Sequence, residues 1–287
     1  IASFFNGFDE GVEFAGGRSY TIKFAKAVNI ETVREDLKKV FGESPIIKTV
    51  DSKNQINITT SYKIKEQGNN IDQEVEALLF KGLEKQLPAG TSLKEFDSQY
   101  KQSSQTVLPT ISDDLKAGAT KATIFALIAI CLYIFIRFRD WRYSLGTIFS
   151  LLHDIFVTLI VFSFLRKVVP FPLEIDQHFI AAILTVIGFS MNDTVIVFDR
   201  IREFAGTHKT WKFSTVIDKA LSTTLGRTIN TSLTTLVVLV AIFLFGGDSI
   251  KGFMFALIVG VAVGTYSSLF VATPIMYDTS KKEEKNK

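Results

Sequence analysis

The chain has 287 residues, of which 26 are Phe, and a mean hydropathy of +0.26, which argues against a wholly soluble protein. Residues 1–117 carry 15 Lys and Arg against 17 Asp and Glu, at the density of a soluble domain. In residues 118–287 the charges fall in short clusters between long apolar runs, and the whole chain has a net charge of only +3. Basic residues placed beside apolar runs determine membrane topology, which excludes a nucleic-acid-binding patch as their main role.

Residues 1–117 are predicted to form a small α+β domain. Period-two alternation and β-branched residues predict strands at 18–24, 45–52, 55–63 and 92–104, the second and third of them joined by a turn at residues 53–54. Apolar residues on one face predict helices at 30–41 and 71–87. Asn29 is a typical N-cap for the first helix, and Gly42 ends it. The order βαββαβ predicts a ferredoxin-like sandwich.

The rest of the chain is predicted to be helical and to cross a membrane. Residues 109–121 form a connector in which Ser112 is expected to start a helix. Five apolar runs follow, at about 118–136, 143–165, 178–198, 228–246 and 252–276, and each offers the roughly 20 residues needed to cross ~30 Å of hydrocarbon. We expect residues 207–226 to form a short amphipathic helix on the cytoplasmic surface and residues 278–287 to form a cytoplasmic tail.

The short loops between these runs predict the orientation. One side of the membrane receives most of the basic residues, namely Arg137, Arg139, Arg142, Arg200, Arg202, Lys209, Lys212, Lys219, Arg227, Lys281, Lys282, Lys285 and Lys287. The other side receives Arg166, Lys167 and Lys251. The first side is therefore cytoplasmic, and the α+β domain lies outside. Because the chain begins at Ile1 without a signal peptide, we expect a further span upstream of it.

Several polar residues fall within the predicted spans, where each central Asp costs about 2.5–3.5 kcal/mol. They are His153, Asp154, Asn192, Asp193 and Asn230, and Arg227 stands directly before the fourth span. A carboxyl group that alternates between a dry setting and an Arg partner would bind and release protons, which is the minimum chemistry of a proton relay. Asp193 and Asp154 are the candidate carboxyl groups for such a relay, and Arg227 is the candidate partner of Asp193.

Each of these residues also has a structural interpretation. Asp193 would then be a permanent salt-bridge partner of Arg227 that holds two helices together. Asp154 would be hydrogen-bonded to backbone or to Ser and Thr hydroxyls and would never titrate. His153 would be a hydrogen-bonding core residue, and Arg227 an interfacial residue of the positive-inside kind.

Other features point to packing rather than to chemistry. Gly260 and Gly264 form a small-xxx-small pair that predicts close helix contact. His178 and His208 have no ligand partners at metal-binding spacing, and we expect no metal or other cofactor. The sequence has neither a phosphate-binding loop nor a nucleophile–base arrangement, so we do not expect an enzyme. Cys131 is the single cysteine and excludes an intrachain disulfide.

Five segments carry a resemblance to a known family. They are GVEFAGGR (11–18), VLPTISDDLKAGAT (107–120), LLHDIFVTL (151–159), SMNDTVIVFDRIRE (190–203) and ALSTTLGRTINTSLTTL (220–236). In this order they resemble the SecF family of bacterial protein-export proteins over nearly the whole chain. Glu13 stands where that family usually has Asp.

The resemblance implies a member of the resistance-nodulation-division superfamily in the bacterial inner membrane. Such a protein would pair with SecD, associate with the SecYEG translocon in the lipid bilayer, and use the proton motive force to draw unfolded preproteins outward. The family's intramembrane Asp and Arg correspond to Asp193 and Arg227, so the resemblance implies that these two residues form the proton relay. Asp154, His153, Asn192 and Asn230 would then support it. Two other functions remain open, an efflux or lipid transporter of the same superfamily and a passive scaffold for the translocon. The sequence does not distinguish H⁺ from Na⁺, or a separate SecF from part of a fused SecDF.

Overall fold

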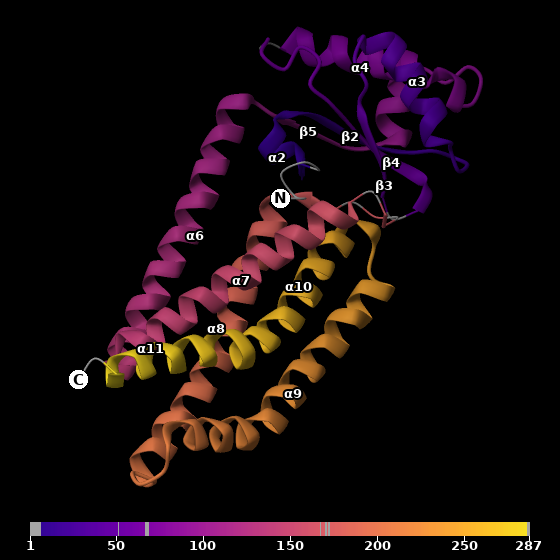
Figure 1. Cartoon of the computed structure of the whole chain (residues 1–287). Helices are drawn as coiled ribbons and strands as arrows, with labels where there is room; N and C mark the ends of the chain where they lie inside the picture. Colours follow the sequence, from indigo (N-terminus) through magenta and orange to yellow (C-terminus); the bar gives the residue numbers. More distant parts are fainter. Residues whose placement is uncertain are drawn as a thin grey trace.

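The computed structural model describes residues 7–50, 52–66, 69–166, 168–169, 171 and 173–285. It consists of an α+β domain at one end of a bundle of long helices (Figure 1). The prediction of an upstream span used Ile1, and the prediction of orientation used Lys167 and Lys287. These three residues lie outside the described residues.

The α+β domain is built on a four-stranded antiparallel sheet. Its strands are β2 (Gly17–Lys23), β3 (Ile46–Val50), β4 (Ser52–Thr60) and β5 (Lys101–Val107). They lie in the order β3-β4-β2-β5, and α3 (Ile30–Phe41) and α4 (Asn69–Leu83) cover one face. This is the order of a ferredoxin-like sandwich, so the predicted fold is confirmed.

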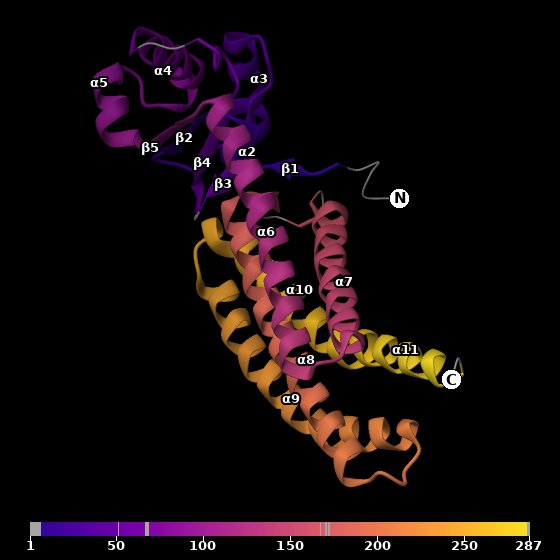
Figure 2. The same ribbon diagram turned by 90° about the vertical axis from the view of Figure 1, so that its left-hand side faces the viewer.

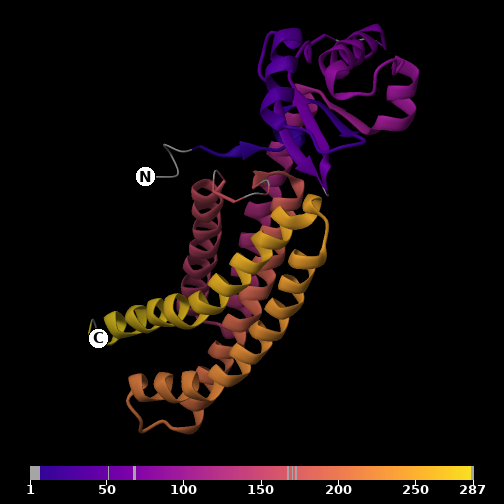
Figure 3. The ribbon, with the colours of Figure 1, turned by 90° about the vertical axis from the view of Figure 1, so that its right-hand side faces the viewer.

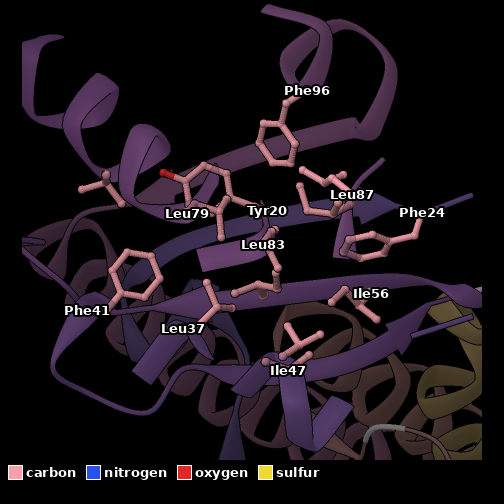
Figure 4. Close-up of a cluster of buried hydrophobic side chains, with 14 residues drawn as sticks. Tyr20, Phe24, Leu37, Phe41, Ile47, Ile56, Leu79, Leu83, Leu87 and Phe96 are labelled. Atoms are coloured by element: carbon pink, nitrogen blue, oxygen red, sulfur yellow. The ribbon is translucent and has the colours of Figure 1, made fainter. Parts of the chain in front are cut away.

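The core of this domain lies between the two helices and the sheet, with side chains from both layers interleaved (Figure 4). The local signals that start and end α3 are those predicted. The Asn29 side chain accepts hydrogen bonds from the N–H groups of Glu31 and Thr32, and Gly42 ends the helix at a φ of 75°. Leu37 on its inner face is fully buried, which contributes about 2 kcal/mol.

Two predictions for this domain were wrong. Residues 92–104 are not one strand, because α5 (Leu93–Glu95) and the π-helical turn η2 (Phe96–Tyr100) precede β5. Ser92 and Glu95 form a reciprocal capping box there, and this local bonding starts a helix despite the alternating pattern. The predicted turn at residues 53–54 is also wrong, since β4 already begins at Ser52. The predicted helix 71–87 is α4 followed by a short 3₁₀ turn, η1 (Glu84–Gln86).

Five helices among the described residues are long and apolar enough to cross a membrane, which confirms the predicted class. Four are α6 (Pro109–Phe138), α7 (Trp141–Leu165), α8 (Gln177–Thr207) and α9 (Phe213–Phe245). The fifth is α10 (Asp248–Ser267), which continues through the π-helical turn η3 (Ser268–Ala272) into α11 (Thr273–Lys285). Figure 3 shows the chain changing direction between α10 and α11.

The helices are longer than the predicted spans. α6 begins at Pro109, so Ser112 lies inside it and is not an N-cap; its hydroxyl donates to the carbonyl of Phe14 instead. The predicted amphipathic helix at 207–226 is not separate, because α9 runs without a break from Phe213. The predicted tail at 278–287 is helical up to Lys285.

A short segment links the two parts of the molecule. It contains β1 (Asp9–Glu10), which pairs in parallel with β6 (Glu174–Ile175), and α2 (Val12–Ala15). Gly16 and Gly17 then turn the chain into β2 at φ values of 70° and 148°, which favour glycine. A Cβ on Gly17 would also lie 3.0 Å from the carbonyl oxygen of Thr60.

Candidate functional site

Asp193 lies near the middle of α8 and is 1% exposed, buried within the helix bundle. Its Oδ2 atom has no hydrogen-bond partner within the described part of the chain. The carboxyl group's polar neighbours are the Ser232 hydroxyl and, at longer range, the Arg227 guanidinium of α9. A carboxylate with an unused acceptor in a dry setting is a group that can take up a proton.

Arg227 does not form the ion pair with Asp193 that the structural interpretation required. Its side chain is exposed and lines a polar cleft of about 340 Å³ between α8 and α9, together with Asp199 and Glu203. Beside it on α9, Thr228 is buried, and its hydroxyl has no hydrogen-bond partner among the described residues. The guanidinium of Arg227 therefore interacts with the Asp193 carboxyl group only at longer range, without a direct ion pair.

Asp154 on α7 is fully buried and has hydrogen-bond partners. Ser190 of α8 donates to its Oδ2 atom at 2.6 Å, and Nδ1 of His153 lies 3.2 Å from its Oδ1 atom. Its surroundings match the alternative in which Ser and Thr hydroxyls hold it in place. His153 is half-buried, and its ring lies 6.2 Å from that of Tyr266.

Hydroxyl groups connect the helices around both carboxyl groups. Ser150 of α7 donates to Ser267 of α10 at 2.9 Å, and Thr194 of α8 donates to Ser268 of η3 at 3.0 Å. Ser232 of α9 lies 2.6 Å from the hydroxyl of Thr265 on α10. Each hydrogen bond of this kind between membrane helices contributes about 0.6 kcal/mol to stability on average.

Gly260 and Gly264 allow α10 to approach α8 closely. A Cβ on Gly260 would overlap the side chain of Val186, and a Cβ on Gly264 would lie 2.9 Å from the Cβ of Ser190. Gly146 does the same for α7, since its Cβ would lie 2.5 Å from the carbonyl oxygen of Ala272. These contacts set the helix register that brings the hydroxyl groups to the carboxyl groups.

The structure brings only some of the predicted site residues together. Asn192 and Asn230 are exposed on α8 and α9 and do not join the buried groups. Sequence reasoning missed the hydroxyl residues that surround the carboxyl groups, namely Ser190, Thr194, Ser232, Thr265, Ser267 and Ser268. Their only signal is spacing, because hydroxyl residues four apart, such as 190 and 194, fall on one helix face.

Comparison with known proteins gives the family. The model for "Protein export membrane protein SecD/SecF, C-terminal" matches residues 89–282, and that for the "SecD/SecF GG Motif" matches residues 1–28. The protein translocase subunit SecF of Rhodothermus marinus is 41% identical over 95% of this chain and 83% of that protein. The Haemophilus influenzae subunit SecF is 38% identical over 97% of this chain and 79% of that protein.

Solved structures agree with this result. The crystal structure of SecDF from Thermus thermophilus, a translocon-associated membrane protein, matches with a TM-score of 0.79 at 29% identity. The match covers 98% of this chain but only 36% of that one. A second SecDF structure, in the super-membrane-facing form, matches with a TM-score of 0.65 at 28% identity.

The fold and the site define a polytopic α-helical membrane protein with a ferredoxin-like domain and two carboxyl groups buried among its spans. The chain belongs to the SecF family of protein-export membrane proteins.

Proposed function

We propose that this chain is an inner-membrane export subunit in which proton binding at Asp193 helps to draw preproteins out of the cytoplasm. The observation that carries the proposal is the 1% exposure of Asp193 together with its unpartnered Oδ2 atom. A permanent salt bridge to Arg227 would instead have kept the carboxyl group ionised. The role is mechanical, and no enzymatic step is part of it.

Protonation would change the bonding around Asp193 in a defined way. The ionised carboxylate only accepts hydrogen bonds, whereas the protonated group also donates one. The Asp193 carboxyl group would attract the Arg227 guanidinium when ionised and release it when neutral. In the neutral state Arg227 would interact mainly with Asp199 and Glu203 in the cleft. Because these residues lie on α8 and α9, the change would shift one helix relative to the other.

Polar residues exposed at membrane depth support a partner in the bilayer. Asn192 on α8 and Asn230 on α9 are exposed in the single chain within the predicted spans and would be costly against lipid. SecD is the proposed partner that covers them, within a complex that associates with the SecYEG translocon. The α+β domain of residues 1–117 would lie on the periplasmic side, where it would meet unfolded preprotein, with the C-terminus in the cytoplasm.

The test is the Asp193→Asn variant in a SecD–SecF complex, because Asn keeps the size of the side chain and removes the exchangeable proton. Completion of preprotein translocation is measured with and without a proton gradient. We expect the gradient-dependent part to disappear in the variant. Normal gradient-dependent completion would rule out the relay, and export indifferent to the gradient in the unmodified complex would favour a passive scaffold.

A further inference from the structure

The linking segment, defined here as residues 9–16, lies where the α+β domain meets the membrane helices (Figure 2). Its strand β1 pairs with β6, with Asp9 opposite Glu174 and Glu10 opposite Ile175. The N–H group of Gly11 continues this ladder by donating to the carbonyl of Ile175 at 3.0 Å. The segment is therefore joined by backbone bonds to the loop that leads directly into α8.

Glu13 of this segment contacts α8 itself. Its Oε2 atom accepts a hydrogen bond of 3.1 Å from the N–H group of Gln177, the first residue of α8. The helix's own N-cap, Asp176, accepts from the N–H group of Phe179 at 2.7 Å. A helix start has N–H groups without intrahelical partners and attracts negative charge, so two carboxylates share the first turn of α8.

The same segment contacts the two preceding helices. Glu10 pairs with Lys116 of α6 at 2.7 Å, and the carbonyl of Phe14 accepts from the α6 hydroxyl of Ser112. Asp9 pairs at 2.9 Å with Arg166, which follows the last residue of α7. The ends of α6, α7 and α8 near the α+β domain are thus all bonded to residues 9–14.

On its other side the segment enters the sheet without a spacer. Gly16 and Gly17 follow α2 immediately, and Gly17 is the first residue of β2, which lies between β4 and β5. A second link runs through Lys48 of β3, which forms an ion pair with Glu174 of β6. Glu13, which contacts the first residue of α8, therefore lies only four residues before Gly17, where an inner strand of the sheet begins.

The contact between this segment and α8 leaves no spare space. A Cβ on Gly11 would lie 2.7 Å from the Cβ of Asp176, so the two backbones are as close as glycine allows. A contact that combines backbone pairing, a charge-assisted hydrogen bond and close packing moves as one unit more readily than it separates.

We propose that Glu13 is a positioning residue that passes displacement of α8 to the α+β domain, and that the linking segment stays closed on α8 while the helix moves. The inference rests on the proposed function, since α8 carries Asp193. It adds the route by which a change at the buried carboxyl group reaches the domain that meets preprotein.

The first test separates coupling from proton movement. Glu13→Ala and Glu13→Gln are compared in a SecD–SecF complex in proteoliposomes, with proton flux and preprotein export measured on the same preparation. We expect Glu13→Ala to keep its flux and to lose about tenfold in export, the scale of one charged hydrogen bond. Glu13→Gln, whose amide oxygen can still accept from Gln177, should recover most of the loss.

Each other outcome contradicts the inference in a distinct way. Unchanged export in Glu13→Ala would remove Glu13 from the route while leaving the proposed function intact. Loss of flux together with export would assign Glu13 to the proton path or to assembly instead of coupling. Failure of the proposed function itself would show in the Asp193→Asn complex, as flux and gradient-dependent export that match those of the unmodified complex.

The second test asks whether the segment opens. In a Cys131→Ser background, cysteines replace Asp9 and Glu174, which face each other in the β1–β6 pair. Neighbouring strands bring their Cα atoms within the range a disulfide spans. We expect equal export by the oxidised and reduced forms of this variant. Export that stops on oxidation and returns on reduction would show that the segment must open, which would overturn the proposal.

Discussion

The hydroxyl group of Ser190 donates to Oδ2 of Asp154 at 2.6 Å, and the backbone carbonyl of Ser190 accepts from Ser268 at 3.2 Å. One residue of α8 therefore bonds both to α7 and to the π-helical turn η3, one helical turn from Asp193. Any movement of α8 that follows a change of charge at Asp193 has to stretch or exchange these bonds. Ser190 consequently links the two buried carboxyl groups mechanically.

Replacing Ser190 with Ala should destabilise the bundle by about 1–3 kcal/mol, because the Asp154 carboxyl group would lose the buried donor on its Oδ2 atom and keep the His153 contact on its Oδ1 atom. Thermal unfolding of the purified protein in detergent measures the change. Ser222→Ala is the matched control, since Ser222 is exposed and its hydroxyl donates to the backbone carbonyl of Asp218 in the same helix. Equal melting temperatures for the two variants would contradict the assignment.

Gly260→Ala should destabilise the protein by about 1–3 kcal/mol, since its new methyl group would overlap Val186, whose branched side chain has little freedom to move. Gly188→Ala, where a Cβ meets no described residue within 4 Å, should be neutral or slightly stabilising. The same unfolding assay compares the two. A second change, Val186→Ala, should restore part of the stability lost in Gly260→Ala, and no such recovery would refute the packing argument.

Arg227→Gln should abolish gradient-dependent export while changing stability by no more than about 0.5 kcal/mol, because the guanidinium is exposed and forms no ion pair with Asp193. A structural salt bridge would behave differently, since removing one partner of a buried pair costs about 3–5 kcal/mol. Export and thermal unfolding are therefore measured on the same variant. A large loss of stability would support the interpretation of Asp193 and Arg227 as a strut.

Asp176 predicts a pH dependence at the start of α8. Burial raises the pKa of its carboxyl group above the ordinary 3.8, and the nearby Glu13 carboxylate adds to the rise, against the Phe179 N–H and His178, which lower it. The folded state then binds more protons than the unfolded chain, so stability falls as the pH rises from about 4 through the raised pKa. At neutral pH the charge is a net cost.

Asp176→Asn should remove this loss, because Asn is as good an N-cap as Asp. We expect the variant and the unmodified protein to have similar melting temperatures at the lowest pH and the variant to be more stable at neutral pH. Asp113→Asn, at an exposed position, is the control for a change of charge alone. A difference that shrinks as the pH rises would contradict the argument.

Much of the fold could be predicted because its signals are local. Asn29 and Gly42 set the ends of α3, and the long apolar runs predict the membrane helices whatever their neighbours are. Residues 92–104 could not be assigned from alternation alone, since the Ser92–Glu95 capping box starts a helix there. The helix ends beyond the apolar runs, such as Pro109, carry no hydrophobic signal.

The candidate site could be predicted only in part. Asp154 and Asp193 stand out because a carboxyl group in an apolar span is costly wherever the helix packs. Their partners depend on which helices cross and at what register, which Gly146, Gly260 and Gly264 set through contacts far apart in the sequence. For the same reason the approach of Glu13 to Gln177 could not be found from either motif alone.

The central claim is that Asp193 gains and loses a proton in a dry setting, and infrared spectroscopy of the membrane-embedded SecD–SecF complex tests it most directly. The carboxylic-acid C=O band is followed through a pH titration in the unmodified complex and in Asp193→Asn. We predict a band that appears as the pH falls and is missing from the variant. A titration identical in both complexes would show that Asp193 keeps one charge state and would contradict the account.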